Sequence, residues 1–121
     1  MRNILIVDDS EMTRSFLHSR LKVLYEVTVT ESTNGKEGLT SLNSNPDIDL
    51  IICDIHMPEM NGAEFIKAVR SSSFHSIPIV VMTTTGMVHD IEEVIECGAN
   101  GVIYKPFDPE KLQVVFDRFI E

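Results

Sequence analysis

Five short apolar runs alternate along the chain with segments whose apolar residues recur every three or four positions. Runs rich in β-branched residues predict strands, and the wider spacing predicts amphipathic helices. The expected strands are Asn3–Val7, Val27–Thr30, Leu50–Cys53, Pro78–Met82 and Gly101–Tyr104. The alternation predicts an α/β fold, a five-stranded parallel sheet covered by five helices on its two faces.

The helices are expected in the intervals after each strand. Their apolar residues fall within 12–24, 39–42, 63–69, 88–95 and 112–119. The last helix is expected to begin near Asp108-Pro109, to run to the chain end, and to bury Leu112, Val115, Phe116 and Phe119.

Length and composition suit a single domain spanning residues 1–121. An apolar content of 43% can fill one core without disulfides, so Cys53 and Cys97 are expected to be ordinary buried thiols. The net charge of -9 repels nucleic acid backbones and anionic membranes, and neither is expected as a direct partner. Because we find neither a spanning apolar stretch nor a leader pattern, the sequence predicts a cytoplasmic protein.

Polar residues of the kinds that bind phosphate groups or metal ions follow four of the expected strands. Asp8 and Asp9 come after the first, Asp54 after the third, Thr83 after the fourth and Lys105 after the fifth. The carboxyl ends of parallel strands meet at one sheet edge, which is where open α/β sheets bind ligands. Each residue taken singly could be a helix cap or a solvated strand end. Their shared placement favours a site.

Three carboxylates at one edge predict a divalent cation. At an effective dielectric near 20, two unit charges about 4 Å apart repel by roughly 4 kcal/mol, so Asp8, Asp9 and Asp54 need a compensating charge. Carboxylate and carbonyl oxygens with retained water are the usual shell of Mg²⁺. Zinc is not expected, because the histidines lack ligand spacing with the cysteines.

The same edge is suited to a phosphoryl group. Lys105 and a cation can neutralise phosphoryl oxygens, and the Thr83 hydroxyl can donate to one of them. Asp54 is the best acceptor candidate because its strand is expected in the middle of the sheet. Attack by its carboxylate on phosphorus would give an aspartyl phosphate.

With these segments in place, the chain resembles the receiver domain of two-component response regulators, in particular the single-domain chemotaxis type. The matching segments are 6–10, 54–62, 78–83, 98–101 and 105–107. The resemblance implies a flavodoxin-like three-layer sandwich with strand order 2-1-3-4-5. It also implies a signalling domain that accepts a phosphoryl group from a histidine kinase, rather than an enzyme acting on external substrates.

The resemblance implies a role for each residue of the site. Asp54 would be the phosphoacceptor, and Mg²⁺ would be bound by Asp9, Asp54 and the backbone carbonyl of His56. Asp8 would act mainly through metal-bound water. Thr83 and Lys105 would contact the phosphoryl group.

The family also implies a cis Lys105-Pro106 bond and a switching surface. Phosphorylation would shift the face formed by the helix near 88–97, the strand 101–104 and the last helix. A downstream protein or an output domain would bind that face, and the receiver would be a monomer or a phosphorylation-dependent dimer. His56 and Thr85 hold positions that tune the phosphate lifetime in this family.

One position departs from the family pattern. Receivers commonly carry an aromatic residue three positions before the lysine, and this chain has Val102 there. Tyr104 is expected on the same sheet face but further along the strand. The aromatic part of the switch is therefore expected to differ in this chain.

Three alternatives keep the fold and change the function. A small aspartate-based phosphatase or phosphotransferase would be expected to show an Asp-x-Asp pattern after the first strand, whereas Asp8 and Asp9 are adjacent. A flavodoxin-like electron carrier would need a phosphate loop where these two carboxylates lie. A receiver-like interaction module that is never phosphorylated would not need the acidic cluster.

Overall fold

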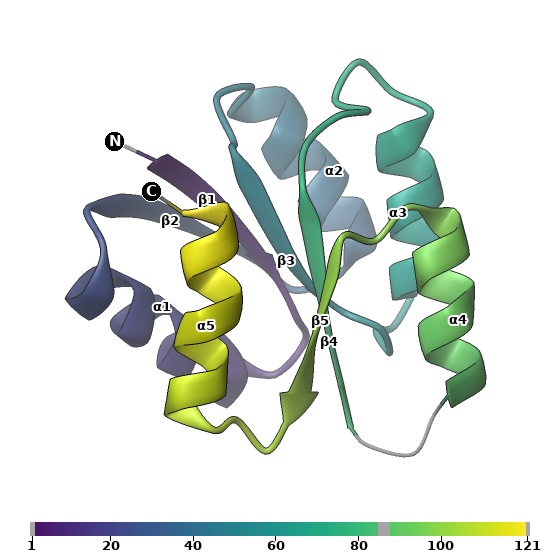
Figure 1. The fold of residues 1–121 in the computed structure, drawn as a ribbon. Helices are drawn as coiled ribbons and strands as arrows, with labels where there is room; N and C mark the ends of the chain where they lie inside the picture. The colour runs from purple at the N-terminus through teal and green to yellow at the C-terminus, as the bar shows by residue number, and fades with distance from the viewer. Residues whose placement is uncertain (1, 85–87, 121) are drawn as a thin grey trace.

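A computed structural model describes residues 2–84 and 88–120, which form one sheet flanked by helices (Figure 1). The elements in chain order are β1 (Arg2–Val7), α1 (Glu11–Leu24), β2 (Val27–Ser32), α2 (Gly35–Ser44), β3 (Leu50–Asp54), α3 (Gly62–Arg70), β4 (Ile79–Thr84), α4 (Val88–Cys97), β5 (Gly101–Lys105) and α5 (Pro109–Phe119). All strand pairs are parallel and the sheet order is β2-β1-β3-β4-β5. The predicted α/β class and strand order are confirmed.

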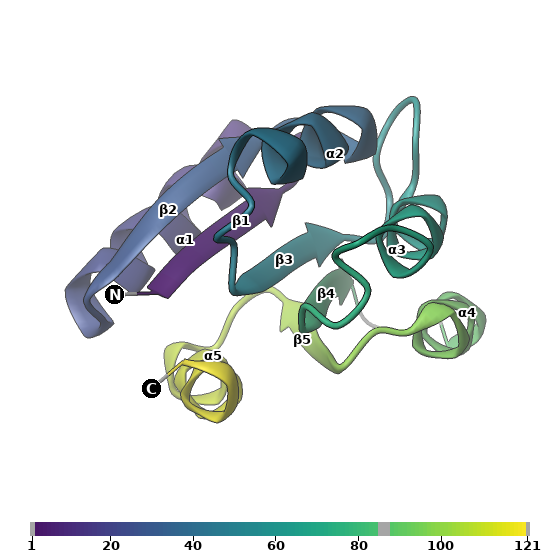
Figure 2. The ribbon, with the colours of Figure 1, turned by 90° about the horizontal axis from the view of Figure 1, so that it is seen from above.

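Helices cover both faces of the sheet, as Figure 2 shows from above. Successive strand residues point to opposite faces, so Leu5 and Val7 pack with α2, α3 and α4, while Ile4 and Ile6 pack with α1 and α5. Two apolar cores result, one on each side of the sheet. The strands β1, β3 and β4 are almost fully buried, which fixes the positions of the residues that follow them.

Side-chain caps begin four of the helices. Ser10, Asn34, Asn61 and Asp108 each accept a hydrogen bond from a backbone N–H in the first turn of the helix that follows. Such caps satisfy donors that have no partner within the helix. At α3 the cap is reciprocal, because Glu64 also accepts from the backbone N–H of Asn61.

The last helix differs from its sequence prediction in two respects. It ends at Phe119, and only Leu112 and Phe116 of the four predicted core residues are fully buried. Val115 and Phe119 are half-buried at the edge of the core. α5 packs on the same face of the sheet as α1, and Figure 1 shows it beside β5.

Among the described residues, no helix is long and apolar enough to cross a membrane. The two cysteines are free thiols, Cys53 buried and Cys97 half-buried. The prediction of unpaired thiols is therefore confirmed, while full burial holds for Cys53 alone.

Candidate functional site

The carboxyl edge of the sheet brings the predicted acidic residues together. Oxygen atoms of Asp8, Asp9 and Asp54 all lie within 4.8 Å of one another. The Lys105 ammonium lies 3.3 Å from Asp8 Oδ2 and 3.5 Å from Asp54 Oδ2. The strands place them there, because β1 and β3 are neighbours and β4 joins β3 to β5.

Burial makes the negative charge of this cluster costly. Asp8 is 0% exposed and Asp54 is 9% exposed, whereas Asp9 faces solvent. Burial raises the pKa of both Asp8 and Asp54 above the ordinary carboxyl value, and the Asp8 charge raises that of Asp54 further. Lys105 opposes both shifts without cancelling them. A bound cation would favour the ionised forms.

The backbone around Asp8 is fixed on all sides. Its N–H donates to the Ser32 carbonyl at 3.0 Å, and its Oδ1 accepts from the Ser10 N–H at 2.8 Å. Its carbonyl accepts from Arg14 Nη1 at 2.7 Å. Sequence reasoning missed the contributions of Ser10 and Arg14 to this site. The position of Ser10 before a helix was a usable signal, but nothing in the sequence marked Arg14.

A tight loop holds the backbone that follows Asp54. The Gly62 N–H donates to the Ile55 carbonyl at 2.8 Å, and a Cβ at Gly62 would lie only 2.8 Å from the Asp54 carbonyl oxygen. Any larger residue at Gly62 must therefore push the loop away from Asp54. The loop also places Glu59 at a φ of 66°, in the left-handed region that most residues avoid.

The side chain of His56 points away from the acidic cluster toward α4. Its Nε2 lies 3.1 Å from Asp90 Oδ2, and the imidazole is 62% exposed. The predicted metal ligand at this position is the backbone carbonyl, and that role stays a prediction. Thr85, the other position expected to tune the phosphate lifetime, lies outside the described residues.

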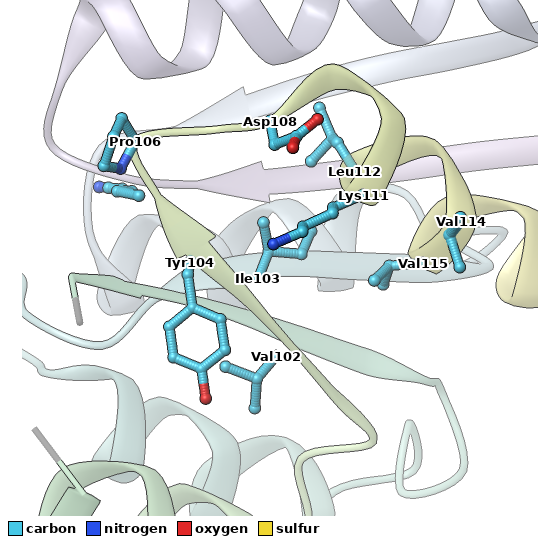
Figure 3. A pocket seen from close by; sticks show the side chains of 10 residues that line it. Val102, Ile103, Tyr104, Pro106, Asp108, Lys111, Leu112, Val114 and Val115 are labelled. Atoms are coloured by element: carbon cyan, nitrogen blue, oxygen red, sulfur yellow. The ribbon is translucent and has the colours of Figure 1, made fainter. Parts of the chain in front are cut away.

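Thr83 and β5 form the other side of the site. The buried Thr83 hydroxyl donates to the neighbouring Thr84 carbonyl at 3.0 Å, so the acidic cluster is not its partner here. Tyr104 pairs with Thr83 in the sheet register. Val102 packs into the core on the α4 side, and Figure 3 shows Tyr104 on the same side of β5, 47% exposed. The Lys105-Pro106 bond is cis, as predicted.

An apolar groove of about 520 Å³ runs between β5 and α5 (Figure 3). Its lining residues are Val102, Ile103, Tyr104, Lys105, Pro106, Asp108, Lys111, Leu112, Val114 and Val115. Lys105 lines this groove, and its ammonium also contacts Asp8 and Asp54 of the acidic cluster. Lys105 is therefore a contact shared by the groove and the site.

The donor set of the cluster fits a hard divalent cation. It offers carboxylate oxygens alone, and two of its three carboxylates are buried with raised pKa values. Mg²⁺ is commonly bound by one or two carboxylates together with water. With Lys105 and Thr83 on the opposite side, the arrangement has the parts needed to stabilise a phosphoryl group in transfer.

Comparisons with known proteins agree with this geometry. Residues 4–117 match the family model described as the response regulator receiver domain. The chemotaxis protein CheY1 of Helicobacter pylori is 40% identical over 117 residues, which cover 93% of this chain and 94% of that protein. A chemotaxis protein CheY homolog of Campylobacter jejuni is 36% identical over 91% of this chain and 85% of its own length. The structure of Vibrio cholerae CheY4 superimposes with a TM-score of 0.90 at 35% identity, covering 99% of both chains.

Proposed function

Because the chain belongs to the response regulator receiver family and is a CheY-like signalling domain, we propose that a histidine kinase phosphorylates it on Asp54. Phosphorylation then switches a face that binds a partner. The observation that carries this proposal is the buried Asp54 carboxylate beside Asp8, Asp9 and the Lys105 ammonium. The proposed unit is one receiver domain over residues 1–121. A cytoplasmic location stays a prediction.

The transfer step uses the Asp54 carboxylate as the nucleophile. One of its oxygens attacks phosphorus, the bond between phosphorus and the donor atom breaks, and the donor leaves with the electron pair. Lys105 lies where its charge can stabilise the negative charge that spreads over the phosphoryl oxygens. Mg²⁺, held by Asp9, Asp54 and the His56 carbonyl with Asp8 acting through water, would supply further neutralising charge.

The switch step starts from the contacts of Lys105 and Thr83. An aspartyl phosphate brings about -1.5 to -2 charges to the site, and this draws the Lys105 ammonium away from Asp8. The Thr83 hydroxyl exchanges its bond to the Thr84 carbonyl for one to a phosphoryl oxygen. Both residues connect the site to β4 and β5, so the change is passed to the surface of β5.

The partner-binding face lies on α4, β5 and α5. Four of its large apolar side chains are at least 47% exposed: Val88, Ile95, Tyr104 and Val114. The groove beside α5 adds a cavity of about 520 Å³ to this face. A downstream protein or output domain that prefers the shifted arrangement would bind the phosphorylated form more tightly.

The proposal is tested by incubating the protein with acetyl phosphate and Mg²⁺ and measuring covalent phosphate. The expected product is stable in acid and released by hydroxylamine, as an acyl phosphate is. Asp54→Asn should show none, while Asp47→Asn, which removes an exposed carboxylate away from the site, should match the wild type. Persistence of the label in Asp54→Asn would refute the assignment.

A further inference from the structure

Arg14 joins three elements beside the acidic cluster. It lies on α1, donates through Nη1 to the Asp8 carbonyl at 2.7 Å, and donates through Nε to Glu31 Oε1 on β2 at 3.1 Å. Its side chain is only 13% exposed. Hydrogen bonds from a partly desolvated guanidinium are directional and stronger than those in open water.

We propose that Arg14 is a positioning residue for the metal site, because it fixes the Asp8–Asp9 turn from which the Asp9 carboxylate projects. The inference rests on the magnesium site of the proposed function. Residues that orient metal ligands from behind commonly change metal affinity when they are replaced.

The carbonyl that Arg14 holds belongs to the peptide unit joining Asp8 to Asp9. The Asp8 N–H and carboxylate are already fixed by Ser32, Ser10 and Lys105. Rotation of the next peptide unit would turn Asp9 away from the cluster and would disturb the bond from the Ser10 N–H to Asp8 Oδ1, which spans Asp9. Asp9 is exposed, and the bond from Arg14 Nη1 to the Asp8 carbonyl directly restrains this rotation.

Glu31 in turn fixes Arg14. Its second oxygen, Oε2, lies 2.8 Å from His18 Nδ1, so the carboxylate is held between two side chains of α1. Glu31 also pairs with Ile6 in the sheet register, one strand position before Val7. The guanidinium is therefore oriented by β2, which lies next to the strand that carries the acidic pair.

Lysine is the informative replacement. It keeps the positive charge near the cluster but has one ammonium on a flexible chain in place of a planar fork. A single ammonium cannot reproduce both bonds with the geometry of Nη1 and Nε. Arg14→Lys therefore separates the positioning of Asp9 from the general electrostatic effect of a cation.

The test is calorimetric titration of Mg²⁺ into the unphosphorylated protein. We expect Arg14→Lys to weaken Mg²⁺ binding by about 10- to 100-fold, the range typical for residues that orient metal ligands. Glu31→Gln should weaken it in the same direction by less. Arg20→Lys is the matched control on the same helix, because Arg20 Nε has no hydrogen-bond partner within the described part of the chain.

Two further measurements exclude a merely structural effect. Without Mg²⁺, hydrogen exchange of the Ser10 amide should be faster in Arg14→Lys, since the turn that holds it has loosened. At saturating Mg²⁺, the phosphorylation rate with acetyl phosphate should return close to the wild-type value.

The proposal is overturned if Mg²⁺ binds Arg14→Lys within twofold of the wild type, or if Arg20→Lys shows an equal loss. Binding is measured on folded protein below the unfolding transition, and Glu31→Gln provides a second variant with nearly unchanged shape. Because no phosphodonor is present, a wild type that binds Mg²⁺ but is never phosphorylated would refute the acceptor role of Asp54 and leave this comparison valid.

Discussion

The two sides of the site are held in different ways. On the β1–β3 side, Asp8 is bonded through its N–H, carbonyl and both carboxylate oxygens to four different residues. On the β4–β5 side, the Thr83 hydroxyl is bonded to the next residue in the chain, and Tyr104 is half exposed. The Thr83 hydroxyl can exchange a bond to its chain neighbour at small cost. Moving Asp8 would require breaking several hydrogen bonds to different residues. The comparison indicates a preassembled acidic side and a β4–β5 side that can rearrange.

The largest expected effect comes from removing the acceptor on the preassembled side. Asp54→Asn should abolish phosphorylation by acetyl phosphate, because an amide cannot act as the nucleophile. The same variant should unfold at a higher temperature than the wild type at neutral pH without Mg²⁺. Asp8 and Asp54 are both buried with raised pKa values, so removing the Asp54 charge should raise the free energy of unfolding by on the order of 1 kcal/mol.

The pH dependence of that stability difference tests its cause. The folded-state pKa of Asp54 is raised above the ordinary 3.8, so the folded protein binds protons before the unfolded chain does. The free energy of unfolding of the wild type should therefore rise as pH falls from neutral through the raised pKa toward 3.8. Asp54→Asn lacks this contribution, and its stability advantage should shrink over the same window. An advantage that grows on acidification would contradict this explanation.

The second largest effect is expected from Asp9. Mg²⁺ at 100 times its dissociation constant should stabilise the wild type by about 2.7 kcal/mol. Asp9→Asn should lose most of this gain at the same concentration, because its amide oxygen carries no net charge. Thermal unfolding with and without MgCl₂ at constant ionic strength measures the difference. An equal gain in the variant would show that Asp9 is not a ligand.

A moderate effect is expected on the β4–β5 side. Thr83→Ala should still accept a phosphoryl group on Asp54, but more slowly than the wild type, since one hydroxyl donor is lost from the transition state. The spectral change that phosphorylation produces in α4, β5 and α5 should be reduced. Amide chemical shifts recorded before and after phosphorylation report both the acceptance of the phosphoryl group and the response of α4, β5 and α5. A full response in β5 without the hydroxyl would refute the role of Thr83 in the switch.

The smallest effect is expected at the contact between His56 and Asp90. The imidazole is 62% exposed, and ion pairs at exposed positions contribute little to stability. Asp90→Asn should change the free energy of unfolding by less than about 0.5 kcal/mol. Chemical denaturation measures this change, and a loss above about 1 kcal/mol would show that the contact holds α4 in place.

The sequence predicted the parts of the site that depend on strand order. Once Asp8, Asp54 and Lys105 follow parallel strands, the sheet itself brings them together, and no further contact has to be known. The cis Lys105-Pro106 bond followed from the resemblance and is confirmed.

The parts that depend on contacts between elements could not be predicted. The bond from Arg14 to Glu31 requires that α1 and β2 lie side by side, which a single sequence does not state. The orientation of the Thr83 hydroxyl depends on a bond rotation that costs little in either direction. The exposure of Tyr104, two residues after a Val102 that packs against the core, likewise depends on how α4 lies against β5.

The most direct test is to locate the modification itself. Protein treated with acetyl phosphate and Mg²⁺ can be reduced with borohydride, which converts an aspartyl phosphate to homoserine, and the peptides can then be sequenced by mass spectrometry. We predict homoserine at position 54 in the wild type, dependent on Mg²⁺. Homoserine at another aspartate, or none in protein that binds Mg²⁺, would contradict the account.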